Sequence, residues 1–163
     1  MRTPERARGE GSAREARPTC TLHFDGRELS GAPDEPLIDF LESHGVEIPH
    51  VCYHRQLGPL ETCDTCWVQV DGQLKRCCTL RSAQGLSIQS AGPPAAAARE
   101  EGMDRLLSKH ELYCTVCENN TGDCTLHNSF ADMHIPVQHY PFRRKPYPKD
   151  ESSPFYTYDP DQC

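Results

Sequence analysis

Short stretches of alternating apolar and polar residues predict that the first part of the chain forms β-strands around one helix. Residues 20–24 alternate and end at Asp25-Gly26, a dipeptide typical of tight hairpins, so we expect residues 27–30 to form the return strand. Residues 36–45 carry apolar side chains at helical spacing between a leading proline and a final glycine. That arrangement predicts a short helix.

A second alternating stretch predicts another hairpin further along the chain. Residues 67–70 and 73–80 are expected to be its two strands, joined by an Asp-Gly turn, and residues 86–89 a closing strand. Two hairpins around one helix predict a small β-grasp domain, to which we assign residues 19–92.

The remainder of the sequence predicts helices followed by an extended segment. Glycine and proline in residues 91–94 separate it from the first domain. Residues 95–109 and 125–134 favour helix, and we expect them to form a small helical domain over residues 93–134. Frequent prolines in residues 135–163 predict an extended C-terminal connector. The expected fold class is therefore α+β.

The composition limits how much hydrophobic core the chain can form. Only 36% of its 163 residues are hydrophobic, and 14 prolines interrupt the pattern, so we expect metal centres to supply part of the stability. The formal net charge of −7 argues against a nucleic-acid partner. No apolar run is long enough to span a membrane.

The N-terminal segment does not have the pattern of an export signal. Residues 1–18 are rich in arginine and glutamate and contain no apolar stretch, so we expect a disordered tail. Without export, the thiols would stay reduced, which favours metal ligation over disulfides. The expected location is therefore cytoplasmic.

Four of the ten cysteines are spaced as ligands of a two-iron cluster. This first ligand set is Cys52, Cys63, Cys66 and Cys78, with gaps of ten, two and eleven residues. Iron–sulfide clusters require thiolate ligands, and the long outer gaps are closer to a plant-type ferredoxin than to a compact zinc knuckle. We therefore expect a 2Fe–2S cluster in a ferredoxin-type domain, with Cys63 and Cys66 on one iron and Cys52 and Cys78 on the other.

Neighbouring residues are rival ligands on position alone. Cys77 adjoins Cys78, and strand alternation would send their side chains to opposite faces, so only one of them can face the cluster. The spacing does not choose between the two. His50 and His54 flank Cys52, and we interpret them as loop residues because four thiols already complete the site.

A second four-ligand set follows the predicted helix of residues 95–109. It comprises His110, Cys114, Cys117 and Cys124, with gaps of three, two and six residues. One imidazole and three thiols suit either a zinc ion or a 4Fe–4S cluster with one histidine ligand, and beside a two-iron motif we expect the cluster. A disulfide framework is a third interpretation of the cysteines. We interpret His127 and His134, on the next predicted helix, as surface residues.

The stretches around these ligands resemble the N-terminal part of molybdopterin-dependent formate dehydrogenase catalytic subunits. The resemblance covers residues 19–163 and is carried by HVCYHRQLGPLETCDTCWVQVDGQLKRCC, HELYCTVCENNTGDC and PFYTYDPDQC. Similar paired cluster domains occur in the large iron–sulfur subunit of respiratory complex I and in iron-only hydrogenases.

The resemblance implies a cofactor for each ligand set. It implies that the first set holds 2Fe–2S, leaving Cys77 as an extra thiol, and that the second holds 4Fe–4S. It also implies that Cys163 is the first ligand of a further ferredoxin-type motif whose companions are missing, as is the molybdenum-binding portion. The chain would then be the electron-relay front end of a formate dehydrogenase, cut short or separately encoded.

The function expected from these residues is transfer of single electrons between two clusters. No nucleophile, general base or cofactor loop offers a catalytic site, so we do not expect the chain alone to oxidise formate. The expected partners are other parts of an oxidoreductase complex, among them a molybdopterin catalytic domain and further ferredoxin-type clusters. The alternative is a zinc-stabilised adaptor without redox activity.

Overall fold

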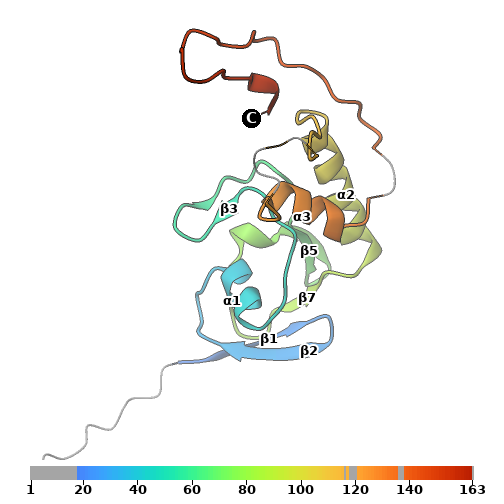
Figure 1. The fold of residues 1–163 in the computed structure, drawn as a ribbon. Coiled ribbons are helices and arrows are strands. Elements are labelled where there is room, and N and C mark those ends of the chain that lie inside the picture. Colours follow the sequence, from blue (N-terminus) through green and yellow to red (C-terminus); the bar gives the residue numbers. More distant parts are fainter. Residues whose placement is uncertain (1–17, 116, 118–120, 136–137, 163) are drawn as a thin grey trace, which may run out of the picture.

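A mixed five-stranded sheet forms the centre of the N-terminal half in the computed structural model, which describes residues 18–115, 117, 121–135 and 138–162 (Figure 1). The strands are ordered β2-β1-β7-β5-β6, with β1 and β7 parallel and the other neighbours antiparallel. Their bounds are Cys20–Phe24 for β1, Arg27–Gly31 for β2, Trp67–Val70 for β5, Gln73–Arg76 for β6 and Ser87–Gln89 for β7. Both predicted hairpins are confirmed. Residues 1–17 of the predicted tail and Cys163 lie outside the described residues.

One short helix completes the core of this half. α1 spans Leu37–Ser43, close to the predicted helix, and Pro36 immediately precedes it. Leu37, Phe40 and Leu41 are fully buried, as expected for its apolar face. They belong to one hydrophobic cluster with inward-facing residues of β1, β5 and β7, so burial of apolar area fixes α1 on the sheet.

The return strand of the second hairpin is shorter than the sequence predicts. β6 ends at Arg76, and Cys77–Thr79 form a short 3-10 helix instead of continuing the strand to residue 80. The expectation that Cys78 lies on a strand is therefore wrong. Alternation along a strand does not decide which way Cys77 and Cys78 point, because both lie in a helical turn.

Two further helices follow the sheet, as predicted. α2 spans Pro93–Leu107 and begins two residues before the expected start, because proline is well suited to the first turn of a helix. α3 spans Thr125–Asp132. Met103 and Leu107 of α2 are fully buried, whereas the chain after α3 is largely irregular.

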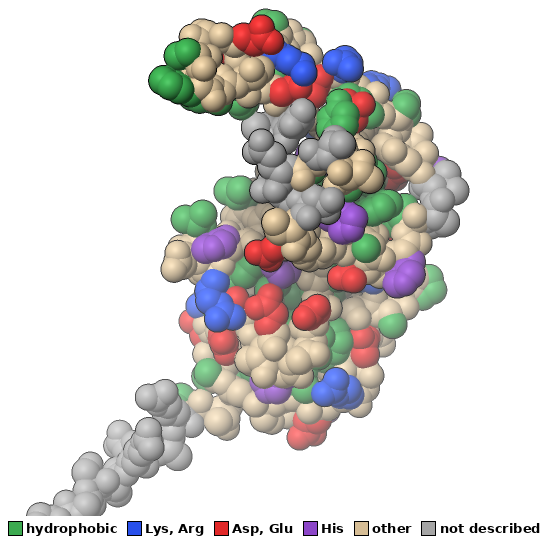
Figure 2. Space-filling view, in the orientation of Figure 1, with side chains coloured by type: hydrophobic (Ala, Val, Ile, Leu, Met, Phe, Trp, Pro, Cys, Tyr) green, Lys and Arg blue, Asp and Glu red, His purple; other side chains and the backbone are tan. Residues whose placement is uncertain are grey.

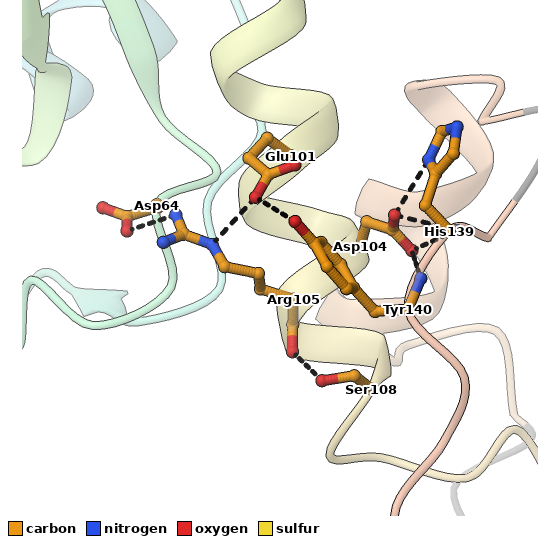
Figure 3. Close-up of polar contacts among 7 residues, drawn as sticks. All are labelled: Asp64, Glu101, Asp104, Arg105, Ser108, His139 and Tyr140. Carbon is orange, nitrogen blue, oxygen red and sulfur yellow. Dashed lines mark hydrogen bonds and ion pairs between the residues drawn. The ribbon is translucent and has the colours of Figure 1, made fainter.

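The extended C-terminal segment is attached to α2 through a buried carboxylate. Asp104 is only 2% exposed, and its oxygens accept hydrogen bonds from the backbone N–H of His139 at 2.9 and 3.0 Å (Figure 3). Nδ1 of His139 lies 3.0 Å from the same carboxylate. Further along, Asp150 and Tyr158 form an isolated antiparallel bridge, and Pro160–Gln162 form a 3-10 helix. Figure 1 shows this part of the chain at the top of the view, away from β1 and β2.

The C-terminal segment exposes several large hydrophobic side chains (Figure 2). They are Tyr147, Phe155, Tyr156 and Tyr158. Elsewhere the large apolar residues are mostly enclosed in the core beneath α1. Within the part of the chain that the structure describes, no helix is both long and apolar enough to cross a membrane.

Candidate metal centres

The first ligand set lies at one end of the β5–β6 hairpin. Cys63 and Cys66 occupy the loop that leads into β5, and Cys78 lies in the 3-10 turn that follows β6. Because the two strands are antiparallel, this loop and this turn meet at the same end of the sheet. The backbone N–H of Cys77 donates to the carbonyl of Cys66 at 2.9 Å, which joins them directly.

The fourth residue of this set reaches the site from a separate loop. Cys52 immediately precedes β3 (Tyr53–His54), which pairs with β4 (Gly58–Pro59) in a small hairpin. The sequence does not predict this hairpin because each strand contains only two residues. Cys52 is half-buried, whereas the other three cysteines of the set are buried.

The four thiols interact in two pairs. Among the neighbouring side chains, Cys63 has the largest effect on the pKa of Cys52, and Cys78 on that of Cys66. Cys78 also feels the charges of Cys52 and Cys63, so all four sulfurs lie within electrostatic range of one another. The sequence expectation placed Cys63 and Cys66 on one iron, and that assignment stays a prediction.

Hydrogen bonds change the acidity of these thiols. The hydrogen bond with Cys78 lowers the pKa of Cys66 to about 7 against the opposing effect of burial. The same hydrogen bond, burial and the neighbouring thiolate charges raise the pKa of Cys78 well above its usual range. Burial would raise the pKa of Cys52, but hydrogen bonds from Cys63 and Thr62 outweigh it and lower the pKa. Two of the four sulfurs are thus biased toward the thiolate, the form that binds metal.

Backbone N–H groups lie beside two of the sulfurs. The Cys52 sulfur accepts from the backbone N–H of Thr62 and Cys63, and the Cys66 sulfur from those of Cys77 and Cys78. The Thr65 hydroxyl lies 3.1 Å from the Cys63 sulfur. Such donors stabilise the negative charge of an iron–sulfur cluster and help to set its potential.

The residues present fit a two-iron cluster. All nine described cysteines are free thiols, which leaves the first set available for ligation and does not support a disulfide framework. Two thiol pairs with backbone donors around them match the need of a two-iron cluster for two sulfur ligands per iron. Among the described residues, no group of three or more His, Cys, Asp or Glu side chains is arranged to hold a single metal ion.

Cys77 is part of the hydrophobic core. Its side chain is completely buried, and that burial raises the pKa of the thiol above its usual range. The Cys78 thiol interacts with the thiols of Cys66, Cys52 and Cys63, whereas Cys77 is affected only by burial and by the charge of Cys66. The geometry therefore favours Cys78 over Cys77 as the fourth ligand of the first set. Cys20 is likewise buried, on β1.

The second ligand set lies between α2 and α3, where residues 116 and 118–120 are outside the described residues. Cys114 and Cys124 are half-buried, Cys117 is exposed, and Cys124 immediately precedes α3. Burial, and next the positive charge of Lys145, lower the pKa of His110, so its imidazole is neutral near pH 7. Neutral imidazole and thiol sulfur are suitable donors for iron, so the residue types fit the expected 4Fe–4S cluster.

His127 contacts this set, although its position on a predicted helix indicated a surface residue. Its Nδ1 lies 3.4 Å from the Cys114 sulfur, and its backbone N–H donates to the Cys124 sulfur at 3.5 Å. The imidazole is exposed, as expected, but α3 aims it back toward the preceding loop. Its place three residues after Cys124, in the first turn of a predicted helix, was the available signal. His134 lies beyond the end of α3.

The fold and the two ligand sets define an iron–sulfur protein with two cluster-binding regions. Residues 17–93 match the family of 2Fe–2S iron–sulfur cluster binding domains, and residues 99–139 match the iron–sulfur binding region of NADH-ubiquinone oxidoreductase-G. These matches mark two iron–sulfur binding regions, so the chain binds one 2Fe–2S and one 4Fe–4S cluster and is an electron-transfer module. The family matches do not support the zinc-stabilised adaptor.

The relatives that are similar to most of this chain are themselves much longer proteins. The chain is 47% identical over 143 residues to "Probable oxidoreductase YjgC" of Bacillus subtilis, covering 88% of this chain and 14% of that protein. It is 43% identical over 148 residues to "Putative formate dehydrogenase YrhE" of the same organism, covering 89% of this chain and 15% of that protein. The chain therefore spans about one seventh of the length of these relatives.

A solved structure shares the fold. The chain superimposes with a TM-score of 0.76 on an NAD+-reducing NiFe hydrogenase in its H2-reduced state. The two are 24% identical, and the match covers 88% of this chain and 61% of the hydrogenase chain. At this identity the likeness supports the arrangement of the elements and not a shared reaction.

Proposed function

We propose that the chain is the electron-relay segment of a molybdopterin-dependent oxidoreductase of the formate dehydrogenase type. The observation that carries the proposal is the meeting of Cys63, Cys66 and Cys78 at one end of the β5–β6 hairpin, where Cys52 approaches Cys63 from a separate loop. The name of one relative, the putative formate dehydrogenase YrhE, supports the formate dehydrogenase class, although the chain spans only 15% of that relative.

We infer the ligands from the same geometry. One iron of the 2Fe–2S cluster would be held by Cys52 and Cys63, and the other by Cys66 and Cys78. The second ligand set would hold the 4Fe–4S cluster through His110, Cys114, Cys117 and Cys124. When bound, the two clusters supply reversible one-electron redox chemistry.

The protein's own groups orient and stabilise this chemistry. Backbone N–H donors around Cys52 and Cys66 favour added negative charge, and burial of the loop keeps water from three of the four sulfurs. The neutral imidazole of His110 in place of a thiolate reduces the negative charge of the second site. The smaller negative charge favours the reduced state of the bound cluster.

The organisation of the chain follows from the same proposal. We assign a β-grasp 2Fe–2S domain to residues 19–92, a small helical 4Fe–4S domain to residues 93–134 and a connector to residues 135–163. The connector would lead, through Cys163, to further ferredoxin-type clusters and to a molybdopterin catalytic domain in a cytoplasmic complex. Exposed aromatic side chains along the connector suit contact with such a partner.

Metal and spectroscopic measurements test the proposal. Protein purified without oxygen should be brown and contain about six iron atoms per chain, the sum of a two-iron and a four-iron cluster. Reduction should produce two distinct paramagnetic signals, and the chain alone should not reduce a dye with formate. A colourless protein with about two zinc atoms would contradict the proposal, and formate oxidation would contradict the absence of a catalytic site.

A further inference from the structure

A single carboxylate in the first ligand loop is bound by two arginines from different elements. Asp64 lies between Cys63 and Cys66 and has a positive φ of 57°. Its Oδ1 lies 2.7 Å from Nε of Arg76 on β6, and its Oδ2 lies 2.9 Å from Nη2 of Arg105 on α2. The Asp64 side chain is 17% exposed, so these pairs are less screened by water than open surface pairs.

The helix α2 approaches this loop at backbone distance. A Cβ added at Gly102 would lie 2.2 Å from the carbonyl oxygen of Asp64, closer than any real contact of that kind. Only glycine therefore permits this approach. The loop is held against α2 by both close packing and the ion pair to Arg105, one turn further along the helix.

Arg105 is itself oriented by the helix. Its Nε lies 3.7 Å from Oε1 of Glu101, one turn earlier, and that carboxylate accepts a hydrogen bond from the Tyr140 hydroxyl at 3.0 Å (Figure 3). Figure 3 shows the guanidinium reaching from α2 toward Asp64, with Glu101 above it in this view. The Arg105 guanidinium thus contacts the ligand loop directly and the connector through Glu101.

We propose that Arg105 is a positioning residue for the 2Fe–2S cluster, holding the Cys63 to Cys66 loop on α2 through Asp64 and raising the cluster's reduction potential. This inference rests on the proposed function. Reduction adds one negative charge to the cluster, and a nearby positive charge stabilises the added charge. The two arginines are matched by the carboxylates of Asp64 and Glu101, so loss of the Arg105 charge alone leaves a net charge of about −1 beside the loop.

Arg76, which shares Asp64 with Arg105, feels the charge of a cysteine of the first ligand set. The pKa of the Arg76 guanidinium is raised chiefly by its hydrogen bond to Asp64, and the charge of Cys78 also contributes. A group paired with Asp64 is therefore within electrostatic range of a first-set sulfur. Arg105 binds the other oxygen of the same carboxylate, which belongs to the loop between Cys63 and Cys66.

Two substitutions give opposite predictions. Arg105→Gln removes one positive charge and should lower the reduction potential of the two-iron cluster. Asp64→Asn removes one negative charge and should raise it, and Asn tolerates the positive φ at this position. A merely structural loosening of the loop would instead move both potentials in the same direction.

The measurement is a redox titration of the two-iron paramagnetic signal in the full chain, with the four-iron signal as an internal reference. Lys149→Gln is the matched control, because Lys149 is 54% exposed and 2.7 Å from Asp159, much as Arg105 is 52% exposed and 2.9 Å from Asp64. The control should leave the two-iron potential unchanged. Arg105→Lys keeps the charge and should stay close to the wild type.

Potentials that fall in Arg105→Gln and rise in Asp64→Asn support the inference. Shifts of the same sign in both, no shift in either, or an equal shift in Arg105→Lys and Arg105→Gln overturn it. If Asp64→Asn does not retain the cluster, the comparison of Arg105→Gln with Arg105→Lys decides alone. A wild-type chain without a two-iron signal would instead refute the proposed function.

Discussion

Nδ1 of His127 lies 3.4 Å from the sulfur of Cys114, across a turn of chain that separates α3 from the preceding ligand loop. A hydrogen bond donated to a cluster sulfur stabilises negative charge and therefore the reduced state. The contact gives His127 a role different from that of His110, which we propose as a ligand. The two roles lead to different results on mutation.

Replacing His127 should shift the second cluster without removing it. In His127→Ala the four-iron signal should persist with a potential lower by about 20–60 mV, the equivalent of one hydrogen bond of about 0.5–1.5 kcal/mol. His110→Ala should abolish or convert that signal, because it removes a ligand. His134→Ala is the control and should change neither the four-iron signal nor its potential. Loss of the cluster in His127→Ala together with its retention in His110→Ala would reverse the proposed assignment.

Gly102→Ala should destabilise the protein, although the same substitution usually stabilises a helix. Alanine is favoured over glycine in a helix interior by about 1 kcal/mol, but here its Cβ would collide with the backbone of Asp64. We expect a net loss of about 1–3 kcal/mol, as in overpacked cores, measured as a lower thermal midpoint of the loaded chain. Ala97→Gly, at an exposed position of α2, calibrates the helix effect. A higher midpoint in Gly102→Ala would contradict the close approach.

Cys77 and Cys78 should respond differently to serine. Cys77→Ser places a hydroxyl in the core and should cost about 1–3 kcal/mol of stability while the two-iron signal remains. Cys78→Ser should lose that signal or alter its spectrum, since it replaces a proposed ligand. Electron paramagnetic resonance and thermal unfolding on both variants separate the effects. Loss of the signal in Cys77→Ser alone would show that the ligand has been assigned to the wrong neighbour.

Asp104 should control how firmly the connector is held. Asp104→Asn leaves some of the N–H groups of His139 and Tyr140 poorly paired and should cost about 1–3 kcal/mol locally. The expected result is faster proteolytic cleavage near residues 138–142, with both clusters retained. Glu100→Gln, an exposed acidic residue on the same helix, serves as the control. Equal cleavage rates in the two variants would show that the buried carboxylate does not anchor the connector.

Local sequence determined most of the elements because their signals act over a few residues. Asp25-Gly26 adopts the positive φ angles that the hairpin requires, and the apolar face of residues 37–41 is buried as its spacing predicts. The choice of iron–sulfur chemistry also followed from sequence, since the spacing of thiols along the chain limits which ligands can meet.

Only the tertiary structure decided how these parts meet. It ended β6 at Arg76, placed Cys77 in the core and paired Cys52 with Cys63, because burial and chain closure act between segments far apart in sequence. It also brought Arg105 to Asp64, 41 residues away. No local pattern encodes that contact, because it requires α2 to pack so closely on a distant loop that only glycine fits at position 102.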